Sequence, residues 1–312
     1  MKRSKEYFEG WYFKQVSKDE RSAISFIPGA SLVKDDPHCF IQHIYVCLDE
    51  NNKKIIQTGY HKFPLGDFVY NDDPFMIDVA NNRFTESAIS VKLKDKNNEI
   101  KAAFRFGPFH SIKKSILMPN MMGFFAYFPK MECYHDVMSM NHLLHGRLSV
   151  DDEKIDFNGG KGYIEKDWGT SFPKKYIWIQ CNNFKNKNGS VFCSVAEIPF
   201  MKKSFPGFIC NLVIDKDEYR FATYNRSKYK IEWPTEEEVT LSFESCKARL
   251  KIEAHLTNTG ELIAPQQGRM EKVIKEGLSG HVNIHLYNKQ NGFTYEDAGN
   301  MAGIEVFCKP SN

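Results

Sequence analysis

Two acidic residues followed directly by a tryptophan mark the most informative stretch of the chain. Glu165 and Asp167 lead into Trp168, and a Gly-Thr-Ser-Phe-Pro turn comes next. A carboxylic acid in a dry, aromatic setting can protonate an alkene, because an apolar pocket disfavours the charged carboxylate and aromatic faces stabilise the cation that forms. We take Asp167 as the first candidate for a general acid because it adjoins Trp168, and Glu165 as the second.

An extended run follows this turn at residues 176–184. Strand side chains alternate between two faces, so one face of this run carries two aromatic rings and then two amides, namely Tyr176, Trp178, Gln180 and Asn182. The other face is also apolar. We expect the aromatic wall to bind substrate, with the amides orienting a phenol or quinone oxygen. The alternative is that the amides satisfy buried backbone groups.

A second acidic strand face lies near the N-terminus. Glu9 alternates with Trp11 and Phe13, which again places an acid beside aromatic rings. Glu9 is therefore the third candidate acid, and Trp11 a candidate for substrate contact, as is Trp168. The competing interpretation is an N-terminal strand in which Glu9 meets an arginine or a backbone amide.

The central acids also have a structural interpretation. One of Glu165 and Asp167 could pair with Lys166 or Lys174, while the other caps the turn before Gly169. Glu165 and Asp167 share a face if the strand persists that far, and Lys166 then lies on the opposite face. The sequence leaves the functional and the structural interpretation open.

Patterns for other chemistry are weak. His142 and His145 are three residues apart, and His281 and His285 share a strand face, but neither pair has a third ligand in register and the HExxH pattern is absent. The chain also lacks a GxSxG nucleophile motif and both glycine-rich phosphate-binding patterns. We therefore expect neither a metal nor an organic cofactor.

Composition points to an ordinary globular protein. The 312 residues are 42% hydrophobic, 26% charged and 14% aromatic, and the high aromatic content suits β structure and hydrophobic pockets. The formal net charge of +3 gives no basic field of the kind that binds nucleic acid, so we expect no nucleic-acid partner.

Targeting signals are weak as well. The first residues contain no apolar stretch long enough for a signal peptide, and no segment approaches the roughly 18 apolar residues needed to span a bilayer. The eight cysteines show no CxxC pair and no spacing typical of a disulfide scaffold. We therefore expect a cytoplasmic protein with reduced cysteines.

Strand signals dominate the chain. Short β-branched and aromatic runs are bounded by Gly, Asn, Asp or Pro turns, a pattern typical of all-β barrels and sandwiches. The predicted strands are 8–16, 40–48, 55–61, 87–94, 99–106, 154–157, 176–184, 190–197, 207–215, 219–224, 239–244, 248–256, 280–287 and 303–307. Helix is scarce: we predict a short helix at 269–276, ended by Gly277, and a turn or two at 135–145.

A polar, glycine-rich change of composition around 149–160 is the best domain boundary. We therefore predict an all-β protein with an N-terminal β-barrel over 1–150 and a C-terminal β-barrel over 151–312.

Several blocks, in order along the chain, resemble the tocopherol cyclase-like family. They are FEGWYFK at 8–14, MECYHD at 131–136, GYIEKDWG at 162–169, FP at 172–173, WIQCN at 178–182, LIAPQQGRM at 262–270 and AGIEV at 302–306. The resemblance implies two lipocalin-like antiparallel β-barrels with few short helices, a fold shared with carotenoid hydratase-like proteins. It also implies a large apolar substrate, often an isoprenoid, and no metal or organic cofactor. Departures at residues 124–127 and near the C-terminus affect the expected substrate more than the fold.

Two functions of different classes follow. The first is an enzyme that cyclises, hydrates or isomerises a prenylated or other lipophilic compound by protonating an alkene; the second is a non-enzymatic lipocalin-type carrier. A lipophilic ligand is expected in either case, with transient contact at a membrane surface for substrate pickup. The apolar segments 121–125 and 205–208 could gate a lipid entrance or simply pack as buried loops. The oligomeric state cannot be read from the sequence.

Overall fold

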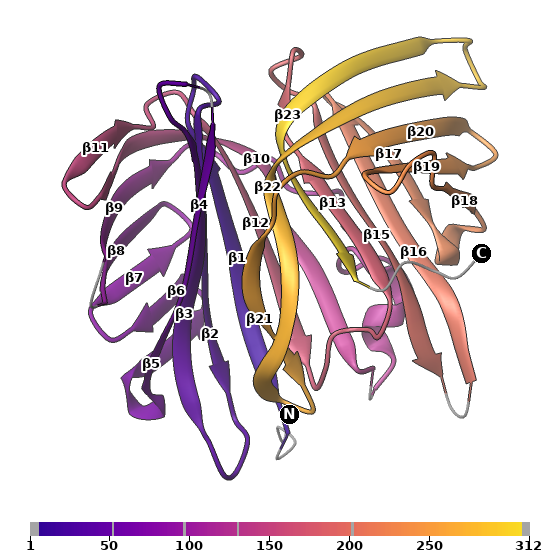
Figure 1. Cartoon of the computed structure of the whole chain (residues 1–312). Helices are drawn as coiled ribbons and strands as arrows, with labels where there is room; N and C mark the ends of the chain where they lie inside the picture. The colour runs from indigo at the N-terminus through magenta and orange to yellow at the C-terminus, as the bar shows by residue number, and fades with distance from the viewer. Residues whose placement is uncertain (1–5, 52, 96–97, 130, 201–202, 308–312) are drawn as a thin grey trace. The chain divides into compact units, whose positions relative to one another are not determined.

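The computed structural model describes residues 6–51, 53–95, 98–129, 131–200 and 203–307, and nearly all of their regular structure is β-strand. The strands form two large antiparallel sheets, labelled in Figure 1. The helical turns among these residues are three short 3-10 segments, η1 (Leu65–Asp67), η2 (Gly123–Tyr127) and η3 (Thr223–Asn225). None of the helices described is long and apolar enough to cross a bilayer. The predicted all-β class is confirmed.

The chain forms two compact units, and neither is one continuous stretch of sequence. The first contains residues 1–111, 137–172 and 262–273, and the second contains 112–136, 173–261 and 274–312. Strand β12 (Lys161–Gly169) pairs with β1 (Phe8–Val16) in the first unit, so a cut at residue 150 would separate these two neighbours. The boundary near residue 150 stays a prediction.

The sheet of the first unit has the order β4-β3-β2-β1-β12-β10-β9-β8-β7-β6-β5, with β11 paired to β10. Besides β1 and β12, its strands are β2 (Ser22–Ser31), β3 (His38–Leu48), β4 (Lys54–Pro64), β5 (Phe68–Asp72), β6 (Phe75–Val79), β7 (Asn82–Thr85), β8 (Ala88–Lys94), β9 (Glu99–Phe106), β10 (Cys133–Val150) and β11 (Glu153–Asp156). Most neighbours in this sheet are joined by hairpins, so local sequence largely determines which strands pair.

One face of this sheet lines the hydrophobic core of the first unit. Trp11 and Phe13 of β1 lie in that core with Ile164 of β12, as strand alternation requires. The ladder between β1 and β2 pairs Gly10 with Gly29 and Phe13 with Phe26, and it lapses between those pairs, beside Pro28. A proline has no N–H to donate to a ladder, which accounts for the lapse.

Gly29 allows β1 and β2 to approach closely at this point. A Cβ atom on Gly29 would lie 2.5 Å from the carbonyl oxygen of Glu9 and 2.6 Å from the ring of Phe40. Any larger residue would push β2 away from the part of β1 that carries Glu9.

The other sheet has the order β17-β16-β15-β13-β23-β22-β20-β19-β18, with β14 paired to β23 and β21 to β22, and it belongs to the second unit except for residues 262–273 of β21 and β22. The strands are β13 (Tyr176–Cys181), β14 (Asn183–Phe184), β15 (Ser190–Phe200), β16 (Lys203–Ile214), β17 (Asp217–Ala222), β18 (Lys228–Glu232), β19 (Glu238–Glu244), β20 (Ala248–His255), β21 (Gly260–Gln266), β22 (Arg269–Asn288) and β23 (Thr294–Phe307). Ile177, Ile179 and Cys181 of β13 lie in its hydrophobic core.

Both predicted helical segments are wrong. Residues 269–276 open the long strand β22, and residues 135–145 lie within β10. In β22 the buried Ile274 and Glu276 alternate with the exposed Lys275, which is the period of a strand. Pairing of β22 with the preceding strand β21 outweighs the weak helix preference of this charged segment.

Candidate functional site

Pairing of β1 with β12 sorts the acidic residues of the first unit onto two faces. Glu9 lies directly opposite Trp168, and Trp11 opposite Lys166. Directly opposed residues of antiparallel strands share a face, so these four side chains belong to the face that carries the core residue Trp11. Glu9 thus lies on one face with Trp11, as the sequence predicts.

Glu165 and Asp167 lie on the opposite face, across from Tyr12 and Gly10 respectively. They share that face, as expected, and Lys166 is on the other. The argument that placed Asp167 first because it adjoins Trp168 is wrong, because consecutive strand residues point to opposite sides. The role of Asp167 as an acid stays a prediction, and Asp167 is only partly buried.

On the core face, the ammonium group of Lys166 is surrounded by aromatic rings. Its Nζ lies 4.4 Å from the ring centre of Trp11, 4.6 Å from that of Tyr70 and 5.4 Å from that of Trp168. The Oε2 atom of Glu9, which is only 2% exposed, lies 3.7 Å from the same Nζ. Aromatic faces stabilise a cation, but here the cation is a lysine of the protein. The sequence analysis considered Lys166 as an ion-pair partner of Glu165 or Asp167, and the structure places Glu9 beside Lys166.

This arrangement predicts a stability effect that does not depend on catalysis. Lys166→Met should destabilise the protein by about 2 kcal/mol, because it leaves the carboxyl of Glu9 buried without its ammonium partner; the partial exposure of Lys166 keeps the cost below that of a fully buried pair. Urea unfolding measures the change. The double variant Glu9→Leu/Lys166→Met should recover most of the loss, and independent, additive losses would contradict the pairing.

On the other face of this strand pair, a buried phenol meets a buried carboxyl. Tyr163 is fully buried, and its hydroxyl donates to Oε2 of Glu165 at 2.6 Å. Burial, followed by the adjacent Glu165, raises the pKa of Tyr163 well above its ordinary value. The tyrosine therefore stays protonated and remains a donor to Glu165.

The second unit carries the predicted aromatic wall. Tyr176, Trp178, Gln180 and Asn182 are all buried, and they alternate with the core residues of β13 as predicted. The acid Glu305 of β23 lies beside this wall, because it is paired directly with Trp178.

Glu305 and Glu276 are the residues that sequence reasoning missed. Glu305 of β23 is paired directly with Glu276 of β22, and the two are 7% and 3% exposed. The hydroxyl of Tyr176 donates to Oε1 of Glu305. Glu305 sits in the block AGIEV, where an acid among apolar residues was the available signal. Glu276 was hidden by the incorrect helix assignment.

A buried pair of carboxyl groups has a defined chemical capacity. The Cβ atoms of directly opposed residues on neighbouring strands lie about 4.5–5.5 Å apart. Carboxylates that come together away from water repel each other, and the repulsion is relieved when one of them is protonated. Aspartic proteases use two neighbouring carboxyl groups that share one proton in this way. Tyr176, Trp178, Glu276 and Glu305 thus combine an acid with aromatic faces, and we call them the acid–aromatic cluster.

The predicted histidine pairs lie in separate environments. His142 is buried, with its Nδ1 2.9 Å from the hydroxyl of Ser139, whereas His145 is exposed. His281 contacts Asn283 and Asn300 through its two ring nitrogens. His285 lies 3.2 Å from Glu253 and 3.2 Å from Glu296.

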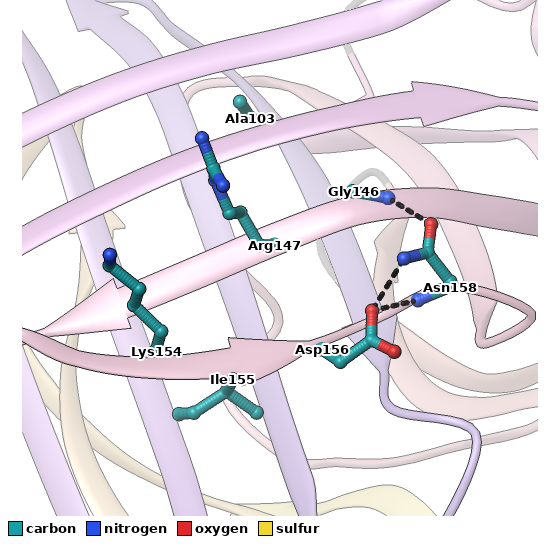
Figure 2. A pocket seen from close by; sticks show the side chains of 7 residues that line it. All are labelled: Ala103, Gly146, Arg147, Lys154, Ile155, Asp156 and Asn158. Atoms are coloured by element: carbon teal, nitrogen blue, oxygen red, sulfur yellow. Dashed lines mark hydrogen bonds between the residues drawn. The ribbon is translucent and has the colours of Figure 1, made fainter.

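The first unit also has an open groove away from the predicted site residues. It lies along β10 and β11, and Figure 2 shows the lining residues Ala103, Gly146, Arg147, Lys154, Ile155, Asp156 and Asn158. Asn158 joins its two walls, accepting from the N–H of Gly146 at 3.0 Å and donating to Asp156 at 2.6 Å. None of the predicted catalytic or binding residues lines this groove.

Known structures share this architecture. CghA superimposes with a TM-score of 0.61 at 8% identity, covering 100% of this chain and 91% of CghA. A putative AttH from Nitrosomonas europaea gives 0.55 at 11% identity, covering 96% and 93%. Kievitone hydratase from Nectria haematococca gives 0.54 at 10% identity, covering 96% and 88%. At such identities the likeness concerns the fold alone, and it places the chain among proteins built from two lipocalin-like β-barrels.

Sequence comparison identifies the family. The tocopherol cyclase-like family model matches residues 79–307, and the chain belongs to this family. The probable chloroplastic tocopherol cyclase of Oryza sativa subsp. japonica is 35% identical, and the chloroplastic tocopherol cyclase of Zea mays 36% identical, each over 74 residues. Each alignment covers 24% of this chain and 16% of the plant protein, so the chain matches only a small part of these relatives.

Proposed function

We propose that this protein is a tocopherol cyclase-like enzyme that cyclises, hydrates or isomerises a prenylated or other lipophilic substrate by protonating an alkene. The observation that carries the proposal is the acid–aromatic cluster, in which the buried carboxyl pair of Glu276 and Glu305 adjoins Tyr176 and Trp178. Family membership supports a substrate of this class.

The proposed reaction conserves atoms and needs no co-reactant other than water. The carboxyl pair transfers its proton to one alkene carbon, which forms a C–H bond and leaves a cation on the more substituted carbon. The ring of Trp178 stabilises that cation. A substrate hydroxyl captures it in cyclisation, water captures it in hydration, and a neighbouring C–H loses a proton in isomerisation. Each route returns one proton to the carboxyl pair.

The three acids inferred from the sequence are retained as alternative donors. Of these, Glu165 is buried and hydrogen-bonded to a phenol like Glu305, whereas Glu9 pairs with Lys166 and Asp167 is partly exposed. Glu165 is therefore the first alternative. The aromatic wall of Tyr176 and Trp178 is proposed to bind the substrate, and the amides of Gln180 and Asn182 to orient one of its oxygens.

The proposed alternative function is a non-enzymatic carrier of a hydrophobic molecule. A carrier needs apolar walls only, and burying carboxyl groups beside them would cost free energy without a return in binding. The paired carboxyls therefore favour the enzyme.

We also propose that the protein works in the cytoplasm. None of the seven cysteines within the described residues forms a disulfide, although Cys193 and Cys210 face each other on neighbouring strands. Cys308 lies outside the described residues. Several cysteines without a disulfide are typical of a reducing compartment.

Solvent deuterium tests the proposed reaction class directly. A panel of prenylated phenols and quinols in detergent micelles, incubated with the protein in D₂O, should give products with one deuterium on carbon, because the alkene receives its proton from an exchangeable carboxyl. Mass spectrometry and NMR locate the label. A product without carbon-bound deuterium would contradict alkene protonation, and tight binding of the panel without any product would favour the carrier.

A further inference from the structure

The second unit exposes a group of large apolar side chains at one place. Ile116 and Leu117 are 88% and 75% exposed, and Phe124, Tyr127 and Phe128 are 42%, 62% and 42% exposed. We call these five residues the apolar tip. Single exposed apolar residues are ordinary, but a contiguous group of this size marks a binding surface.

The most exposed part of the apolar tip is a tight turn with an unusual sequence. The N–H and C=O groups of Ser115 and Met118 bond to each other in both directions, at 2.9 and 3.0 Å, so Ile116 and Leu117 alone form the turn. Two-residue turns of this kind favour Asn, Asp and Gly. Two large aliphatic residues in this turn bury little apolar surface when the protein folds, so their presence indicates contact with another molecule.

The turn is held in place by side chains behind it. The hydroxyl of Tyr127 donates to the carbonyl of Ile116 at 2.7 Å, which ties the turn to η2. Arg220 donates to the carbonyl of Lys113 at 2.8 Å, and Glu218 accepts from the N–H of Lys113 at 2.8 Å. The apolar side chains are therefore presented on an ordered support, which reduces the conformational entropy lost on binding.

The charged residues within the segment that carries the apolar tip are all basic. No Asp or Glu occurs between Glu99 and Glu132, and Lys113 and Lys114 immediately precede the turn. Lys113 is exposed, and Lys114 pairs with Asp136 at 2.9 Å. Aliphatic, Phe and Tyr side chains bordered by lysine are the composition that enters the interfacial zone of an anionic bilayer.

We propose that the apolar tip inserts into the surface of an anionic lipid bilayer and docks the protein where lipophilic molecules are dissolved. The inference rests on the proposed function only in that a lipophilic substrate must be collected from lipid. Ile116 and Leu117 enter the acyl boundary, the aromatic residues lie at the level of the headgroups, and Lys113 contacts anionic headgroups.

Vesicle binding tests this proposal without any substrate. The wild-type protein should float with vesicles of an equal mixture of phosphatidylcholine and phosphatidylglycerol, and less with phosphatidylcholine alone. Ile116→Ser/Leu117→Ser should lower the partition coefficient at least about tenfold, because it removes most of the inserted apolar area. The matched control Ile55→Ser/Leu143→Ser changes two other exposed aliphatic residues, 41% and 54% exposed, and should bind like the wild type.

A tryptophan placed at the turn reports insertion locally. Leu117→Trp should add blue-shifted emission with vesicles that brominated lipid quenches. With substrate, Ile116→Ser/Leu117→Ser should keep wild-type turnover in detergent micelles and lose turnover on vesicle-embedded substrate. If neither the wild type nor Ile116→Ser/Leu117→Ser turned over substrate in micelles, the result would count against the proposed function alone.

Three results would overturn the docking proposal. The first is a wild-type protein that does not bind vesicles of either composition. The second is equal binding by wild type and Ile116→Ser/Leu117→Ser. The third is a concentration-dependent dimer that the same double substitution dissociates, which would make the apolar tip a contact between two copies of the chain.

Discussion

Glu305→Gln is expected to lower turnover of the alkene substrate at least about 100-fold, the usual scale for losing a general acid. Glutamine keeps the shape of the side chain and still accepts a hydrogen bond from Tyr176, but it removes a carboxyl that can hold and transfer the proton. Substrate affinity should change little, because the aromatic wall is untouched. Initial rates and equilibrium binding, measured on the same preparation, separate these effects.

The matched variants in the same experiment locate the acid. Glu276→Gln should also lose most activity, because a single carboxyl in this place no longer shares a proton, whereas Glu305→Asp should recover part of it. Asp167→Asn, Glu165→Gln and Glu9→Gln test the donors inferred from the sequence. If Glu305→Gln is folded and fully active while Glu165→Gln is inactive, the proton comes from Glu165. Full activity of all five amide variants would contradict acid catalysis.

Most of the fold could be predicted because strand alternation is a local signal. The segments 8–16 and 99–106 were placed with the bounds that the structure gives β1 and β9. Strand β2 was missed because Pro28 and Gly29 lie within it, and both residues disfavour a strand assignment. Strands β5, β6 and β7 were missed because each is only four or five residues long, so their pairing comes from neighbours in the sheet.

The candidate site was harder to predict because it depends on register between distant strands. Sequence placed Tyr176 and Trp178 on one face, since alternation alone determines that. It could not place Glu305 beside Trp178, or Glu276 beside Glu305, because these pairs join strands that are far apart in the chain. Adjacency in sequence also misled the choice of Asp167, since Trp168 lies on the other face of β12.

The second large effect expected is a loss of stability in mild acid, caused by buried histidines of the first unit. Burial lowers the pKa of His142 to about 3 and that of His43 to about 4, with His61 nearby adding to the shift of His43. His142 packs against the rings of Phe106 and Phe109 at 4.6 and 4.9 Å, and its Nε2 has no hydrogen-bond partner among the described residues. Burial is therefore what disfavours a charged ring at this position.

These lowered pKa values fix the direction of the pH dependence. An unfolded histidine takes up a proton near pH 6.5, whereas His142 and His43 in the folded protein do so only near pH 3 and pH 4. Between these limits the unfolded state binds more protons, so stability is complete above about pH 6.5 and falls as the pH falls towards 4. The two histidines together should remove about 3–4 kcal/mol of the free energy of unfolding between pH 7 and pH 5.

Urea unfolding at a series of pH values measures this effect, and single substitutions assign it. His142→Gln should lower stability at pH 7, because it disturbs a packed site, but it should remove about half of the loss between pH 7 and pH 5. His43→Gln should remove a similar share.

His145→Gln is the matched control, because His145 is exposed on the same strand as His142, and its pH profile should follow the wild type. A His142→Gln profile as steep as that of the wild type would show that the acid sensitivity arises elsewhere, with the carboxyl groups as the next candidates. A flat wild-type profile would show that both rings reach water or a partner before the protein unfolds.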